Sequence, residues 1–111
     1  LIFNTQFLET EDGTVIRNPF PPNAESLDSG LQVYTANCQI CHGQTGKGDG
    51  LGARLLDPPP ADLVVHSSLH TDRALFKFID EGIEGTGMGA MGDDLTDEEI
   101  WHVINYIQTL E

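Results

Sequence analysis

The sequence is poor in three things: basic residues, cysteine and long apolar runs. Five Lys and Arg stand against eighteen Asp and Glu, which gives a formal net charge of −13. Nucleic acid is therefore not an expected partner, because phosphate binding needs clustered Lys and Arg. No apolar run approaches the roughly eighteen residues that a membrane helix needs. The first residue is Leu1 rather than Met, so we expect a processed or excised chain whose membrane association, if any, depends on a missing segment.

The length of 111 residues fits one small domain with an N-terminal appendage. Apolar residues on both sides of Asp12 and Gly13 predict a short β-hairpin. The Pro-rich stretch 18–22 that follows predicts an extended strap. We therefore expect residues 1–25 to form a hairpin and strap, and residues 26–111 to form the main domain.

Three stretches carry apolar residues at steps of three or four, which predicts helices. The first starts with Ser26 as its N-cap and runs into the two cysteines. The second covers residues 72–81 and ends at Gly82, and the third begins with a capping box of Thr96 and Glu99. Glycine-rich loops without regular elements are expected between them. The predicted apolar faces of the first and third helices are Leu27, Leu31, Tyr34, Cys38 and Cys41, and Ile100, Val103, Ile104, Ile107 and Leu110.

One motif carries chemistry, the run Cys38-Gln39-Ile40-Cys41-His42. Two cysteines at this spacing followed by histidine are typical of c-type haem attachment, in which each thiol adds to one haem vinyl group. A thioredoxin-type redox pair is disfavoured because no βαβ pattern surrounds the motif. Half of a zinc site is disfavoured because a second cysteine pair is missing. The motif therefore predicts one haem c, with His42 as the proximal ligand of its iron.

A low-spin electron carrier needs a sixth iron ligand, and a methionine thioether is one that raises the reduction potential. The chain has two methionines, Met88 and Met91. Both lie in a loop so rich in glycine that its backbone could approach a flat macrocycle closely. Either methionine could instead fill the core.

Over residues 26–111 the sequence resembles bacterial class I cytochromes c. The resemblance implies an all-α fold of three main helices around one haem, in which the first and last helices cross tightly. That crossing would place Gly30 and Tyr34 against Val103 and Tyr106. The matching parts are Gly30 and Tyr34 ahead of the haem motif, residues 43–50, Pro59-Pro60-Ala61-Asp62-Leu63, and Met88 upstream of residues 95–101.

The resemblance also assigns the iron ligands. It implies that Met88 is the sixth ligand and that Met91 packs beside the haem. One departure is Gly89, which stands where the family usually has proline and leaves the loop less constrained. Cys38, Cys41, His42 and Met88 are thus the expected haem-binding residues, with His42 and Met88 on the iron.

In similar proteins a proline carbonyl accepts the hydrogen bond of the proximal imidazole. The resemblance makes Pro59 and Pro60 the candidates for this acceptor. His66, His70 and His102 are rival iron ligands by residue type, but the methionines stand where the family places its ligand. We therefore expect these three histidines to be surface or hydrogen-bonded residues.

The implied function is single-electron transfer between redox proteins, so the chain is not expected to be an enzyme. Haem attachment by this motif occurs outside the bacterial cytoplasm, which implies the periplasm or the outer face of the cytoplasmic membrane. The acidic surface suits a partner with a basic docking surface. Two alternatives stay open: a haem domain of a larger redox enzyme or membrane complex, and a haem-based small-ligand sensor in which Met88 dissociates.

Overall fold

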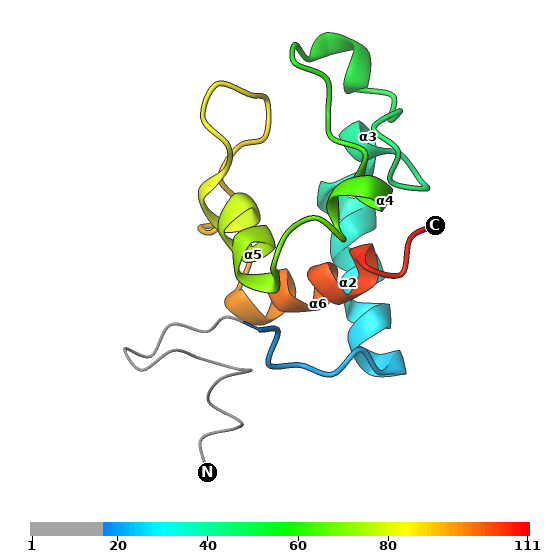
Figure 1. The fold of residues 1–111 in the computed structure, drawn as a ribbon, viewed down its shortest axis with the longest axis vertical. Coiled ribbons are helices and arrows are strands. Elements are labelled where there is room, and N and C mark those ends of the chain that lie inside the picture. The colour runs from blue at the N-terminus through cyan, green and yellow to red at the C-terminus, as the bar shows by residue number, and fades with distance from the viewer. Residues whose placement is uncertain (1–16) are drawn as a thin grey trace.

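The computed structural model describes residues 17–111, so the predicted hairpin around Asp12 and Gly13 lies outside the described residues. Within that range the chain is helical and contains no strand, as the all-α prediction requires (Figure 1). None of the described helices is long and apolar enough to cross a membrane. The elements are α2 (Ala24–Asn37), α3 (Gln39–His42), the 3-10 helix η1 (Ala53–Leu55), α4 (Leu63–His66), α5 (Asp72–Glu81) and α6 (Asp97–Ile107).

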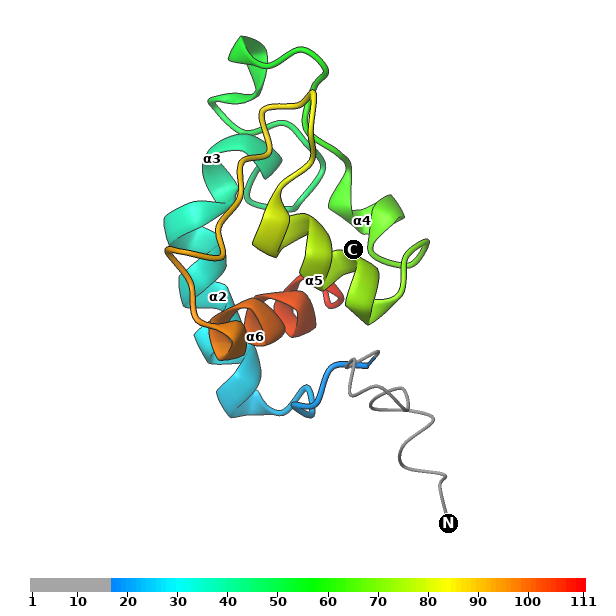
Figure 2. The same ribbon diagram turned by 90° about the vertical axis from the view of Figure 1, so that its left-hand side faces the viewer.

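Helices α2 and α6 cross at Gly30 and form the centre of the core (Figure 2). A Cβ atom added to Gly30 would collide with the carbonyl oxygen of His102 and lie 2.8 Å from Cβ of Tyr106. The ring centre of Tyr34 lies 5.3 Å from that of Tyr106. The implied crossing of the first and last helices is therefore confirmed, and the absent side chain of Gly30 lets the two backbones meet. The fully buried side chains around it are Tyr34, Ile100, Val103 and Ile104.

The start of α2 differs from the prediction. The N-cap is Asn23, whose side chain accepts a hydrogen bond of 2.9 Å from the amide of Ser26. Ser26 is instead buried, and its hydroxyl contacts Nδ1 of His102 at 2.7 Å and accepts from the side-chain amide of Asn105 at 2.9 Å. Both residues are good caps by type. Asn23 is the cap because Ser26 bonds to His102 and Asn105 of α6 instead. No local sequence pattern indicates these distant partners.

The buried face of α2 was also predicted incorrectly at Leu31, which is 43% exposed. The helix buries small and aromatic residues against α6, and the apolar step pattern does not count glycine or serine. The predicted helix is also interrupted at Cys38, where α2 gives way to the single turn α3. The residues of α2 that are buried are Ser26, Gly30, Val33 and Tyr34.

The strap between residues 17 and 23 has no regular secondary structure, as expected, yet it is bonded to α6. The side-chain amide of Asn18 donates to the carbonyl of Trp101 at 2.7 Å and to Oδ1 of Asn105 at 3.0 Å. Asn105 in turn donates to the carbonyl of Phe20 at 3.0 Å. The ring of Phe20 lies 4.7 Å from that of His102. The described part of the strap therefore covers one side of α6.

Helix α5 has the predicted bounds, and α6 has the predicted start but ends at Ile107, so Leu110 lies beyond the helix. Thr71 caps α5, and Gly82 follows its last residue. At the start of α6 the amide of Glu99 donates to Thr96 Oγ1 at 3.1 Å, and the Thr96 amide donates to the Glu99 carboxylate at 2.8 Å. These caps act within one turn, so the sequence reports them directly.

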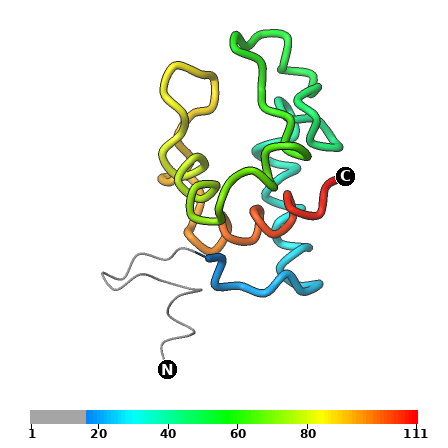
Figure 3. The backbone as a smooth tube through the Cα atoms, viewed as in Figure 1, coloured from blue at the N-terminus to red at the C-terminus, as the bar shows by residue number. Residues whose placement is uncertain are grey.

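The two glycine-rich loops extend on the same side of α6 (Figure 3). The first was predicted to have no regular element, which is wrong because it contains η1; the single turn α4, which follows this loop, was not predicted. The single turn of α4 starts at Asp62, whose carboxylate accepts from the amides of Val64 and Val65. Such short turns have no periodicity to detect, although Asp62 is a recognisable cap.

Candidate haem-binding site

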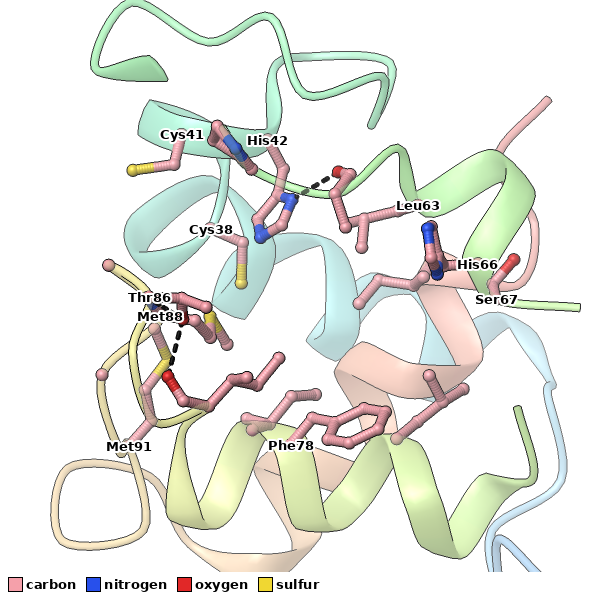
Figure 4. A pocket seen from close by; sticks show the side chains of 18 of the residues that line it. Cys38, Cys41, His42, Leu63, His66, Ser67, Phe78, Thr86, Met88 and Met91 are labelled. Atoms are coloured by element: carbon pink, nitrogen blue, oxygen red, sulfur yellow. Dashed lines mark hydrogen bonds between the residues drawn. The ribbon is translucent and has the colours of Figure 1, made fainter. Parts of the chain in front are cut away.

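A cavity of about 500 Å³ lies between the two loops and the helices. This volume is in the range of small-molecule and cofactor sites. Cys38, Cys41, His42 and Met88 all line it, so the structure brings the four predicted site residues together (Figure 4). The rest of the lining is largely apolar, with contributions from Leu56, Leu63, Leu75, Phe78, Ile79, Ile83, Ile104 and Ile107.

The break between α2 and α3 positions the haem motif. The amide of Cys38 still donates to the carbonyl of Tyr34 at 2.8 Å, and the amide of His42 donates to the carbonyl of Cys38 at 2.9 Å. One turn of helix therefore brings both cysteines and the histidine to the same cavity. The two thiols are not joined in a disulfide. Burial raises the pKa of the Cys38 thiol to about 12, so this thiol is protonated at neutral pH.

The first glycine-rich loop folds back onto the motif, a feature that the sequence reasoning missed. The amides of Gly48, Gly50 and Gly52 donate to the carbonyls of His42, Cys41 and Ile40 at 2.8, 3.1 and 2.7 Å. A Cβ atom on Gly50 would lie 2.6 Å from the carbonyl oxygen of Gln39. Glycine is therefore required where the loop contacts α3. The alternating glycines after the motif were the signal of this close approach.

The imidazole of His42 is oriented by a backbone carbonyl. Its Nδ1 lies 3.1 Å from the carbonyl oxygen of Ala61, so the prediction that Pro59 or Pro60 supplies this acceptor was wrong. Both prolines line the cavity, but the acceptor is the carbonyl of the residue that follows Pro60, just before the N-cap Asp62 of α4. Burial lowers the pKa of His42, and the bond to Ala61 opposes that shift only in part. A neutral ring with hydrogen on Nδ1 leaves the Nε2 lone pair free for a metal.

Met88 and Met91 lie across the cavity from Cys38 and His42 (Figure 4). Both side chains are half-buried and contact the core. Met91 is tied to α5 because its amide donates to the carbonyl of Ile79 at 3.0 Å. Met88 is held inside its own loop, where its carbonyl accepts from the amide of Ile83 at 2.9 Å. The geometry thus offers two thioether sulfurs opposite one imidazole.

The three rival histidines fall into two groups. His102 does not line the cavity and contacts Ser26 and Phe20 on the other side of α6. His66 and His70 do line the cavity, and their rings contact one another, with Nδ1 of His66 3.4 Å from Nε2 of His70. All three are hydrogen-bonded in the structure.

These residues fit a covalently held haem. Two free thiols and a neutral imidazole occupy one wall, two thioether sulfurs face them, and apolar side chains fill most of the remaining lining. An apolar surround of this kind excludes water from an iron centre and influences its potential.

Comparison with known proteins agrees with this interpretation. Residues 25–107 match the family model described as cytochrome C oxidase, cbb3-type, subunit III. The chain is 31% identical over 85 residues to cytochrome c6 of Gracilaria tenuistipitata var. liui, covering 76% of this chain and 72% of that protein. It is 28% identical over 96 residues to thiosulfate dehydrogenase of Stutzerimonas stutzeri, covering 84% of this chain but only 30% of that relative.

Among solved structures, the fold is similar to a chain of the Kuenenia stuttgartiensis reducing HAO-like protein complex. The TM-score is 0.70 at 23% sequence identity, and the match covers 97% of this chain and 53% of the other. At this identity the likeness concerns the fold alone. The chain therefore spans a minor part of one curated relative and about half of this structural neighbour.

Proposed function

This chain belongs to the class I c-type cytochromes, which bind haem c covalently and transfer electrons, and we propose that four residues hold its haem. Cys38 and Cys41 form the thioethers, and His42 and Met88 ligate the iron. The observation that carries this proposal is the placement of both thiols and the His42 ring opposite Met88 in one cavity. When bound, the haem iron supplies one-electron chemistry by cycling between the ferric and ferrous states.

We further propose that the domain is an electron carrier and catalyses no reaction of its own. With His42 and Met88 both on the iron, no open position is left for oxygen or peroxide. Within the described residues, no Lys, Arg, Asp or Glu lines the cavity. The other histidines of its lining, His66 and His70, are bonded to each other. The chain thus offers little acid or base chemistry at the iron.

Two features favour Met88 over Met91 as the ligand. The resemblance to class I cytochromes c implies that Met88 is the ligand. In addition, the Met91 backbone is held against α5 by Ile79, whereas Met88 belongs to the loop that faces the haem motif. Met91 then packs beside the haem as an apolar neighbour, a role that suits its flexible side chain.

The test is an optical spectrum of the ferric holoprotein and of two variants, Met88→Ala and Met91→Ala. A methionine-ligated ferric haem gives a weak charge-transfer band near the red end of the spectrum. We expect the band in the unmutated protein and in Met91→Ala, and its loss in Met88→Ala. Retention in Met88→Ala with loss in Met91→Ala would reverse the assignment. A band missing from the unmutated protein, together with rapid carbon monoxide binding to its reduced form, would instead indicate an open iron.

The partner surface is proposed to include the exposed edge near Cys41. Leu51 and Leu55 are 84% and 88% exposed, and Ile40 is also exposed. A Cβ atom on Gly52 would lie 3.3 Å from Ile40 Cγ1 and 3.7 Å from Cys41 Sγ, so this apolar surface reaches the haem motif. Residues 78–111 contain no Lys or Arg. A redox protein with an apolar centre and basic groups toward that acidic segment would fit both features.

We propose the periplasm or the outer face of the cytoplasmic membrane as the location, because haem attachment by this motif takes place there. A second candidate is a haem domain within a larger redox protein. The 30% coverage of thiosulfate dehydrogenase and the 53% coverage of the HAO-like complex chain favour it. Electron transfer through the same haem site would serve either role.

A further inference from the structure

The histidine pair in the cavity wall is unexplained by the iron ligands. His66 and His70 lie near the turn between α4 and α5, and both line the cavity. Their rings are nearly parallel, at 13°, yet their centres are 5.6 Å apart while Nδ1 of His66 and Nε2 of His70 are 3.4 Å apart. The rings therefore meet through their nitrogen edges. In that arrangement one N–H donates to the lone pair of the other ring.

The pair also provides the charge that the rest of the cavity lacks. No Lys or Arg lines the cavity in the described part of the chain, and Nδ1 of His42 is bonded to Ala61. With His42 on the iron, His66 and His70 are the lining side chains that can become positive. A haem carries two carboxylates, which lose hydration on burial and need partners.

The chemistry of haem attachment indicates where those carboxylates go. The vinyl groups and the carboxylates occupy opposite edges of the macrocycle, and the vinyl edge is held at Cys38 and Cys41. Figure 4 shows these cysteines toward one end of the cavity and His66 with Ser67 toward the other. A haem bound through these cysteines would therefore have its carboxylates toward the end that holds the histidine pair.

We propose that the His66–His70 pair binds the haem carboxylates and takes up a proton when the iron is reduced. This inference rests on the haem site proposed above. In the holoprotein, the redox partner would supply one electron to the iron and the buffered solvent would supply one proton to the pair, and no covalent bond would form or break apart from the new N–H bond. Reduction removes one positive charge from the iron, so a proton on the pair is repelled less in the ferrous state.

Other charged groups near the pair are occupied elsewhere or lie outside the cavity lining. Asp62 of α4 accepts from the amides of Val64 and Val65. On α5, which contacts His70 through the ring of Phe78 at 5.1 Å, Asp72 accepts from Asn18 and Gln108. The remaining charged residues of α5 are Arg73, which lies over the Phe76 ring, and Lys77, Asp80 and Glu81, none of which lines the cavity.

The test is the reduction potential of the holoprotein between pH 5 and 8, the range in which histidine ordinarily changes charge. We expect the potential of the unmutated protein to fall as pH rises. His66→Asn and His70→Asn keep a hydrogen-bonding group but remove the charge, so each should lower the potential at pH 5 and flatten the profile. His102→Asn is the matched control, because His102 lies outside the cavity, and it should keep the full pH dependence.

A flat profile in the unmutated protein, or an unchanged slope in both pair variants, would overturn the inference. The red-end band is recorded on every sample to separate this outcome from failure of the haem site. If the band persists in all variants while only the slope is lost in the pair variants, the inference stands. If the unmutated protein lacks the band, the proposed ligand set fails, and this inference fails with it.

Discussion

Replacing Gly30 with alanine should open the crossing of α2 and α6. The new Cβ would collide with the carbonyl oxygen of His102 and lie 2.8 Å from both the carbonyl carbon of His102 and Cβ of Tyr106. Carbon atoms pack at about 3.5–4.0 Å, so the helices must separate by roughly 0.7 Å or more. Overpacking of a core costs about 1–3 kcal/mol, and these atoms belong to the helix itself and cannot rotate away. The gain in helix propensity returns only about 1 kcal/mol.

The overlap includes the rigid backbone of His102, so we expect the upper end of the overpacking range. After the gain in helix propensity, the net loss is about 2 kcal/mol in the free energy of unfolding, measured by urea titration of the holoprotein followed by circular dichroism. Ser29→Ala serves as the control, because it adds no volume to the neighbouring position of α2. We expect this control to change stability by less than about 0.5 kcal/mol. A Gly30→Ala variant as stable as the unmutated protein, or more stable, would show that the crossing is loose and would refute the argument.

Two other predictions concern buried hydrogen bonds. Tyr34→Phe removes the 2.6 Å bond to the buried carbonyl of Gly43 and should cost about 1–3 kcal/mol. Burial raises the pKa of Tyr34 to about 12, and the unfolded tyrosine ionises first. The free energy of unfolding should therefore fall as pH rises from 10 to 12. In urea titrations, the part of this fall that is due to Tyr34 should be missing from Tyr34→Phe. The same pH dependence in both proteins would contradict the prediction. Asn105→Ala removes the three side-chain bonds to Asn18, Phe20 and Ser26 and should cost about 2–3 kcal/mol, whereas the exposed Gln108→Ala should cost less than about 0.5 kcal/mol in the same titration.

The fold was predictable wherever a signal acts within one turn of helix. Thr71 and Gly82 bound α5, and the reciprocal bonds of Thr96 and Glu99 start α6. The start of α2 was not predictable, because Asn23 and Ser26 are both good caps. Ser26 is taken up by partners 76 and 79 residues away in the sequence. Such a choice depends on the packed structure and leaves no local pattern.

The site was predictable to the extent that covalent chemistry sets residue spacing. Cys38, Cys41 and His42 must be adjacent in sequence to serve one haem, so their motif is readable. The acceptor for His42 lies 19 residues away, and its position depends on where α4 begins. The identification of Ala61, rather than Pro60, as the acceptor therefore required the structure. The contact between His66 and His70 also required the structure. The two residues are four apart in the sequence, but that spacing alone does not show that their rings meet.

The loop that carries Met88 is stabilised without the proline that the family usually has at the position of Gly89. Proline would stiffen the loop by fixing one φ angle. Instead, the Met88 amide donates to Thr86 Oγ1 at 3.1 Å, the Thr86 hydroxyl donates to the carbonyl of Ile83 at 2.7 Å, and the amide of Ile83 donates to the carbonyl of Met88 at 2.9 Å. These three bonds close a ring at the base of Met88.

The loop is supported from outside this ring as well. Gly82, with a φ of 75°, would place a Cβ atom 2.8 Å from the carbonyl oxygen of Met88, so the loop backbone rests directly on the end of α5. A Cβ atom on Gly87 would lie 3.3 Å from Cδ1 of Leu56, whereas one on Gly89 would meet nothing within 4 Å. The hydrogen bonds that restrain the backbone around Met88 thus do not involve residue 89. The sensor alternative depends on a mobile Met88, and Gly89 was the feature that favoured it. Because Met88 is restrained without a proline, the presence of glycine at residue 89 alone gives no reason to expect Met88 to dissociate from the iron.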